Sequence, residues 1–358
     1  MVIEKDRIRT LDGLRAVAIF LVIASHSIDH GKFPALALGG IAGVMIFFAL
    51  SGYLITTRLL DEYERTGQIS LRNFYLRRAF RILPSAVTFL SVVWILSGLA
   101  IVKCDGRSLL SALLFFANYM DLREMAWRVG HFWSLSVEEH FYLIWPFLLI
   151  VFGVRKGWRT AAFVAILICL WRFTDTHYRV VSTAFNAPYL EGLGFRTDLI
   201  ADTMLWGCLL AFFRFAIGSV VSTAIVLVSI ASLVLFYTGL SDSLVSRNHA
   251  ETFAHIIPAI LLGALVSCPA SPIGKILDAP PIRLVGRLSY SLYIWQQLFL
   301  GGDDSIRLAL PLALAAAFIC AYLSYRYIEQ PFIGFGRQFL TGLRPHPSAE
   351  RASAERAV

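Results

Sequence analysis

Apolar residues fill this chain in long runs that shorter polar segments interrupt. About 20 consecutive apolar residues are needed for a helix to cross a bilayer, and ten runs reach or approach that length. They cover residues 11–29, 38–57, 83–102, 132–153, 160–174, 197–217, 219–238, 253–268, 285–301 and 308–327. The pattern predicts an all-α fold class, a polytopic membrane bundle of about ten transmembrane helices.

The composition agrees with a membrane protein. The chain of 358 residues is 57% hydrophobic and only 16% charged, whereas a soluble domain carries about 25% charged residues. The net charge of +8 gathers in particular connecting segments. Such clustering sets membrane topology and gives no reason to expect nucleic-acid binding.

The distribution of cations predicts the orientation of the helices. Lysines and arginines before residue 11, at 58–81, at 155–159, at 275–283 and beyond 337 all fall on one side of a ten-span chain. Outer segments are poorer in cations, with exceptions at Lys103, Arg107, Arg123 and Arg128. The positive-inside rule therefore predicts cytoplasmic termini. We expect a multi-pass protein of a cell membrane, the bacterial inner membrane. We expect residues 1–334 to form the transmembrane domain and 335–358 to be a polar, disordered cytoplasmic tail.

The five cysteines have no CxxC spacing and lie mostly in apolar runs. They are expected to act as small hydrophobic residues, with no disulfide framework and no metal site.

Arg15 and His26 are the most informative pair of polar residues. Eleven positions separate them in one apolar run, so they share a helix face and stand about 16 Å apart along its axis. Ionisable residues inside a membrane helix are costly and are therefore functional candidates. His26 can act as a base near neutral pH, as acyl transfer to an alcohol requires. The alternative is that both residues anchor the helix ends at the membrane surfaces.

Three arginines, Arg77, Arg78 and Arg81, gather on the predicted cytoplasmic side, just before Pro84. Guanidinium groups bind phosphates bidentately, so this cluster could hold a phosphorylated cofactor or substrate. A topological or lipid-headgroup role explains the same charges. Pro84 is expected to redirect the chain before the third helix begins.

Adjacent carboxylates, Glu138 and Glu139, lie near the head of the fourth apolar run. Either could accept a proton, orient a histidine or hold a substrate hydroxyl, and neighbouring positions point about 100° apart. An acid pair at a helix N-terminus is also favoured by the helix dipole. The sequence alone leaves open which of the two glutamates faces a site.

Other polar residues inside apolar runs are candidate substrate ligands. Asp202 shares a helix face with Asp198, and Arg196 is near enough for a structural pairing instead. Ser289, Tyr290 and Tyr293 supply hydroxyl groups within the ninth run, where helix–helix hydrogen bonding is the competing explanation.

Together these motifs resemble the acyltransferase 3 family of integral-membrane O-acyltransferases. The resemblance rests on Leu11-Asp-Gly-Leu-Arg15 with its ten-residue gap to His26, Phe47-Phe-Ala-Leu-Ser51-Gly52, Arg77-Arg78-x-x-Arg81, Trp133-Ser-Leu-Ser-Val-Glu138, Ser289-Tyr-Ser-Leu-Tyr-Ile-Trp295 and Tyr325-Arg-Tyr-Ile-Glu329-Gln-Pro331. Each motif is weak alone, but six in the family's order across residues 8–333 are specific.

The resemblance implies transfer of an acyl group, usually acetyl, from cytoplasmic acyl-coenzyme A (acyl-CoA) to a sugar hydroxyl outside the membrane. It implies that Arg15, His26 and Glu138 are catalytic, and that Arg77, Arg78 and Arg81 bind the acyl-CoA co-substrate. Glu139, Asp202, Ser289, Tyr290 and Tyr293 are the expected acceptor ligands. We expect no tightly bound cofactor. The expected partners are a glycan or glycolipid acceptor and membrane lipids.

The sequence departs from the family pattern at three positions. Met45 stands where an acidic residue is frequent, Gln296 where histidine often follows the tryptophan, and Ile200 where an arginine is usual. These departures concern the acceptor site. The competing function is a transporter or flippase for a glycan precursor, without acyl-transfer chemistry.

Overall fold

The computed structural model describes residues 8–27, 34–121, 124–184, 195–213, 215–237, 247–301 and 308–342. Within these ranges every regular element is a helix, and no strand is present. The longer helices are α1 (Thr10–Ser27), α2 (Pro34–Thr66), α3 (Leu71–Gly98), α6 (Phe132–Phe152), α7 (Gly157–Tyr178), α10 (Asp202–Phe212), α11 (Ser219–Tyr237), α12 (Arg247–Ser267), α14 (Pro280–Phe299), α15 (Leu310–Ser324) and α16 (Gln330–Gly342). The shorter ones are α4 (Gly106–Leu113), α5 (Trp127–Gly130), α8 (Val180–Ala184), α9 (Thr197–Ile200) and α13 (Pro272–Leu277).

Seven of the described helical segments are long and apolar enough to cross a membrane. They contain α1, α2, α3, α6, α7, α11 and α15. Helices α10, α12 and α14 coincide with the other three predicted runs, but α10 and the apolar part of α12 are shorter. The all-helical, multi-span architecture is thus confirmed, whereas the count of ten and the side of the termini stay predictions.

The outer surface of the bundle suits contact with lipid. Large apolar side chains are exposed along several helices, among them Trp94 on α3, Phe163 on α7 and Val220 on α11. A water-facing helix would carry polar residues at such positions. The lipid tails of a bilayer would cover these side chains instead.

One expectation about a helix boundary changes. The predicted break at Pro84 is wrong, because α3 continues through this proline from Leu71 to Gly98. In an apolar setting a proline removes one backbone donor, whereas a full break would expose several polar backbone groups. The division into a transmembrane domain and a tail at residue 334 stays a prediction: α16 crosses this position and ends at Gly342, and residues 343–358 lie outside the described residues.

Glycines allow two pairs of helices to pack with their backbones in contact. A Cβ atom at Gly286 on α14 would collide with the backbone oxygen of Asp12 on α1, and one at Gly52 on α2 would collide with that of Met204 on α10. Small residues permit this close approach in membrane bundles. It fixes α1 and α14 beside each other at the end where α1 begins.

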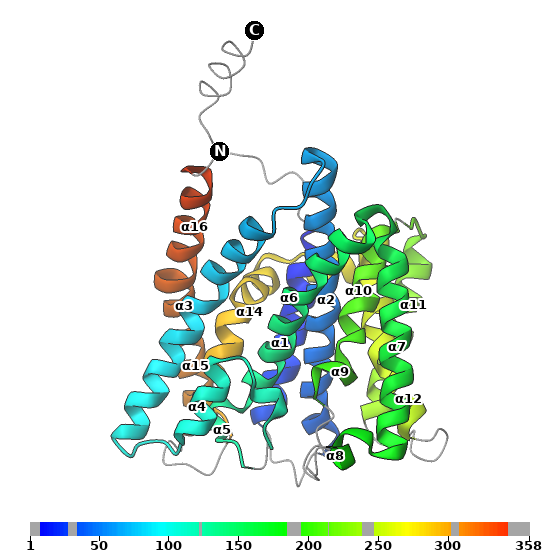
Figure 1. Cartoon of the computed structure of the whole chain (residues 1–358). Coiled ribbons are helices and arrows are strands. Elements are labelled where there is room, and N and C mark those ends of the chain that lie inside the picture. The colour runs from blue at the N-terminus through cyan, green and yellow to red at the C-terminus, as the bar shows by residue number, and fades with distance from the viewer. Residues whose placement is uncertain are drawn as a thin grey trace.

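Figure 1 shows the central position of α1, α2, α6 and α14, with α3, α15 and α16 on one flank and α7, α11 and α12 on the other. The short helices α4 and α5 lie at the end of the bundle opposite α16 (Figure 1). The sequence predicts an interfacial or re-entrant helix over residues 109–116, and α4 confirms that a helix forms there, over Gly106–Leu113.

Candidate active site

A cavity of about 870 Å³, counted with its open mouth, lies among α1, α2, α3, α6 and α14. Its walls carry four arginines and two glutamates together with apolar and hydroxyl side chains. The charged residues are Arg15, Arg58, Arg78, Arg81, Glu138 and Glu139.

Glu138 is held in place by two hydroxyl groups. Ser51 on α2 donates a hydrogen bond to its Oε1 at 2.8 Å, and Tyr142, one turn further along α6, donates to its Oε2 at 3.0 Å. The carboxylate is also within electrostatic reach of Arg78 and Arg15. Both glutamates line the cavity, and these two hydrogen bonds hold the carboxylate of Glu138 in place.

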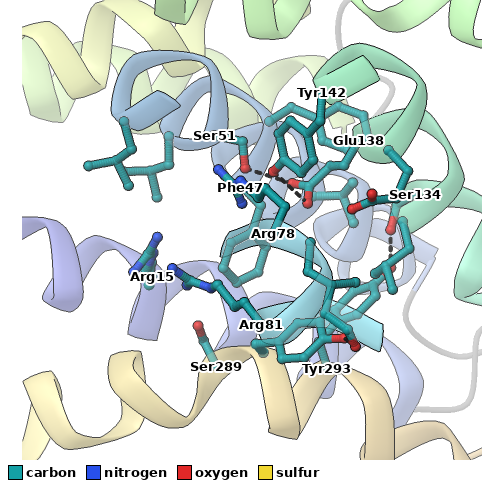
Figure 2. Close-up of a pocket in the computed structure, with 18 of the residues that line it drawn as sticks. Arg15, Phe47, Ser51, Arg78, Arg81, Ser134, Glu138, Tyr142, Ser289 and Tyr293 are labelled. Atoms are coloured by element: carbon teal, nitrogen blue, oxygen red, sulfur yellow. Dashed lines mark hydrogen bonds between the residues drawn. The ribbon is translucent and has the colours of Figure 1, made fainter. Parts of the chain in front are cut away.

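The arginines converge on the cavity from three helices. Figure 2 shows the guanidinium groups of Arg15 and Arg81 pointing toward one another, with Arg78 on the far wall. Arg78 lies over the ring of Tyr142, 4.1 Å from its centroid, a cation–π contact that orients the guanidinium. The excess of positive over negative side chains makes this cavity suited to an anion.

Arg77 lies apart from Arg78 and Arg81. Its side chain is 47% exposed and pairs with Glu62 on α2 at 2.9 Å. Around the helix, position 77 points about 100° away from position 78, whereas positions 77 and 78 both lie near the face of position 81. Arg77 instead lines a neighbouring cavity of about 380 Å³, which also touches Arg58, Arg78 and Arg81.

Tyr293 and Ser134 form the wall of the cavity toward the start of α6 (Figure 2). The two hydroxyl oxygens lie 2.5 Å apart, and the Tyr293 hydroxyl donates to the backbone carbonyl of His131 at 3.0 Å. Ser289 and Tyr290 also line the cavity. The Tyr290 hydroxyl donates to the carbonyl of Ile82 at 2.7 Å, which favours the predicted helix–helix role for this residue.

His26 lines neither cavity. Its Nδ1 lies 2.9 Å from Oε1 of Gln296 on α14, and its ring meets Trp127 edge-on with the centroids 5.4 Å apart. His131 lies within electrostatic reach of His26 and packs edge-on against Tyr293. Tyr293 on the cavity wall thus contacts His131, which in turn lies near His26.

Asp202 is also absent from the cavity lining. It is fully buried in an ion pair with Arg172 of α7, at 2.9 Å, and lies 2.8 Å from Nδ1 of His255 on α12. Arg196 pairs separately with Asp175 and Asp198. The structure thus gives the predicted acceptor ligand Asp202 a place in a network that joins α7, α10 and α12.

Sequence reasoning assigned no role to several residues of this site. Ser51, Arg58, Ser134 and Tyr142 line the cavity, and Gln296 contacts His26. For Ser134 and Tyr142 a signal existed, since each is four residues from Glu138 and so shares its helix face. Ser51, Arg58 and Gln296 reach the site only because helices distant in sequence pack together. No pattern in the neighbouring sequence indicates their role.

Comparison with known proteins agrees with this architecture. Residues 8–326 match the acyltransferase 3 family, described as an acyltransferase domain. The peptidoglycan O-acetyltransferase OatA of Listeria monocytogenes is 31% identical over 92% of this chain and 56% of its own length. The O-acetyltransferase OatA of Staphylococcus aureus is 31% identical over 90% of this chain and 56% of its own length.

The chain spans only about half the length of these relatives, 56% of each. No solved structure matches it significantly. The family match begins two residues before α1 and ends two residues past α15, and it includes every helix that lines the cavity. This chain belongs to the acyltransferase 3 family.

Proposed function

We propose that this chain is a membrane O-acyltransferase that moves an acyl group, specifically acetyl, from cytoplasmic acyl-CoA to a hydroxyl of an extracytoplasmic glycan or glycolipid. The observation that carries the proposal is the cavity lined by arginines and glutamates, together with His26, which Gln296 contacts on the neighbouring helix. Family membership and two relatives named as O-acetyltransferases support the chemistry. The peptidoglycan in the name of one relative supports a polysaccharide of the cell envelope as acceptor.

The orientation of the chain in the membrane is inferred from the distribution of charge. Cations crowd the end of α2 and the beginning of α3, at Arg58, Arg65, Arg72, Arg77 and Arg78, and the positive-inside rule assigns that end to the cytoplasm. Ten spans with both termini cytoplasmic, in a bacterial inner membrane, are consistent with this assignment. The arginine-lined cavities then face the acyl donor, and His26 lies toward the acceptor side.

The donor would enter through both cavities. Arg58, Arg78 and Arg81 line each of them, so they can contact the phosphates of an acyl-CoA while its arm reaches the larger cavity. Charge-assisted hydrogen bonds from guanidinium groups suit such phosphates. Acyl-CoA is a co-substrate that leaves after each turnover. Its arm passes the cavity wall at Tyr293 and Ser134 and presents the thioester to His26.

The transfer itself is direct. His26 accepts the proton of the acceptor hydroxyl while the hydroxyl oxygen attacks the thioester carbonyl carbon. A new carbon–oxygen bond forms, the carbon–sulfur bond breaks, and the proton passes from His26 to the departing thiolate of coenzyme A. The products are an acylated glycan and free coenzyme A. No metal or covalent acyl-enzyme is required.

Arg78 is expected to matter more for donor binding than Arg77. Hydrogen bonds to charged groups contribute about 1.5–3 kcal/mol, so Arg78→Ala should raise the Michaelis constant for acyl-CoA by about 10- to 100-fold. Arg77 is half exposed and paired with Glu62, and Arg77→Ala should raise it by less than about fivefold, since exposed ion pairs contribute at most about 1 kcal/mol. Initial rates at varied acyl-CoA measure both, and equal effects of the two variants would contradict this donor site.

The function is tested by deleting the gene and analysing surface glycans by mass spectrometry. We expect loss of one type of acyl increment, restored by the natural chain and not by the His26→Ala variant at matched membrane levels. An unchanged set of acylated glycans, measured across the envelope polysaccharides and glycolipids, would refute the proposal.

A further inference from the structure

The contact between His26 and Gln296 joins two helices far apart in sequence. Oε1 of Gln296 lies 2.9 Å from Nδ1 of His26. The Gln296 side chain is completely buried, so water does not compete for this hydrogen bond. A hydrogen bond between fully buried and half-buried groups fixes both side chains more firmly than one at the surface.

The scaffold around the contact is rigid. The close approach of Gly286 to Asp12 fixes α1 and α14 at one end, and the contact of Gln296 with His26 joins them at the other. The two helices therefore run side by side in the same direction. Trp127, whose ring meets His26, is itself fixed by a 2.9 Å hydrogen bond from its Nε1 to the carbonyl of Leu300.

The chemistry of this contact determines which nitrogen of His26 is protonated. An amide oxygen can only accept a hydrogen bond, so the nitrogen that faces it must carry the proton. A neutral imidazole protonated at Nδ1 has its lone pair on Nε2, the nitrogen that can then accept a proton from a substrate. We propose that Gln296 is a positioning residue that holds His26 in this tautomer, an inference that rests on the proposed role of His26 as the base.

A neutral amide differs from the carboxylate that often partners a catalytic histidine. A carboxylate orients the ring and also stabilises its protonated form, whereas an amide orients the ring with little such bias. His131 is a titratable group within electrostatic reach of His26, and a proton on one imidazole would oppose a proton on the other. Gln296 thus orients the base without favouring a charge that His131 opposes.

The adjacent glutamine makes a different contact and provides a matched control. Gln297 is also buried, and its Oε1 accepts a hydrogen bond from the backbone nitrogen of His131 at 3.1 Å. The two residues share type, helix and burial, but differ in the histidine they contact. Replacing each with leucine therefore separates the loss of a buried amide from the loss of the contact to His26.

The test is nitrogen NMR of the full chain, with 15N-labelled histidine, in lipid nanodiscs. The His26 signals are those lost in the His26→Ala variant. We expect the pattern of an Nδ1-protonated ring, its loss or averaging in Gln296→Leu, and its retention in Gln297→Leu. In the transfer assay Gln296→Leu should lower kcat by about 100-fold, the lower range of general-base catalysis, with the Michaelis constant for acyl-CoA unchanged.

Gln296→Glu keeps an acceptor oxygen in place and adds a negative charge. It should retain the Nδ1-protonated pattern and move the acidic limb of the kcat profile to higher pH, because the carboxylate stabilises the protonated ring. A proton on Nε2 in the natural chain, or a His26 signal indifferent to Gln296→Leu, would overturn the proposal. Failure of the proposed function is distinguishable, because it shows as undiminished turnover in His26→Ala whatever the NMR spectrum.

Discussion

Replacing His26 with alanine should abolish acyl transfer while the chain still binds its donor. General-base catalysis contributes about 10²–10⁴-fold to a rate, and kcat should fall by a factor in that range. His26 lines neither arginine cavity, so the dissociation constant for acyl-CoA should stay within about twofold of the natural value. Single-turnover transfer and equilibrium binding of a non-hydrolysable acyl-CoA analogue measure the two effects separately.

This separation of binding from chemistry is the informative result. A variant that loses binding and transfer together would place His26 in the donor site, which the geometry contradicts. A variant with full activity would remove the base from the mechanism. Size-exclusion chromatography and thermal unfolding of the detergent-solubilised variant serve as controls for folding.

Replacing Glu138 with alanine should produce the next largest loss of transfer activity. The change leaves the hydroxyls of Ser51 and Tyr142 without their shared acceptor and removes negative charge that attracts Arg78 and Arg15. Truncating one partner of a buried charge cluster costs about 2–5 kcal/mol. We therefore expect kcat/KM for acyl-CoA to fall by about 100-fold or more.

Glu138→Gln and Glu139→Gln complete this experiment. An amide at position 138 keeps one oxygen that accepts hydrogen bonds but carries no charge. Glu138→Gln should therefore lower kcat/KM by less than Glu138→Ala does. Glu139 lines the same cavity and lies near both Arg78 and Glu138, and Glu139→Gln should cost less than about tenfold in kcat/KM. The reverse order, with Glu139 the sensitive position, would assign the catalytic carboxylate to Glu139.

The sequence predicts the architecture well because its signal is periodic and local. Long apolar runs and clustered cations indicate a multi-span helical bundle, and the run over 132–153 matches α6 almost residue for residue. The shared face of Arg15 and His26 follows from helix geometry alone. The six ordered motifs identify the family, which the comparison confirms.

The sequence does not predict which residues meet across the bundle. Arg77 and Arg78 look equivalent in the sequence, but only Arg78 lies against the ring of Tyr142 in the structure. Asp202 resembles a substrate ligand until its buried partner Arg172, on another helix, is known. Position 296, noticed only as a departure from the family pattern, holds the glutamine that contacts Nδ1 of His26. Each of these contacts depends on packing between distant segments.

In the proposed function, the chain couples consumption of acyl-CoA to acylation of a glycan across a membrane. The direct test uses the purified chain in vesicles, with radiolabelled acetyl-CoA on the side of the Arg78 end of α3 and envelope glycan on the other. We predict equal amounts of acetylated glycan and free coenzyme A thiol, both absent with His26→Ala. Movement of glycan or label across the membrane without release of free thiol would contradict this coupling and indicate a transporter.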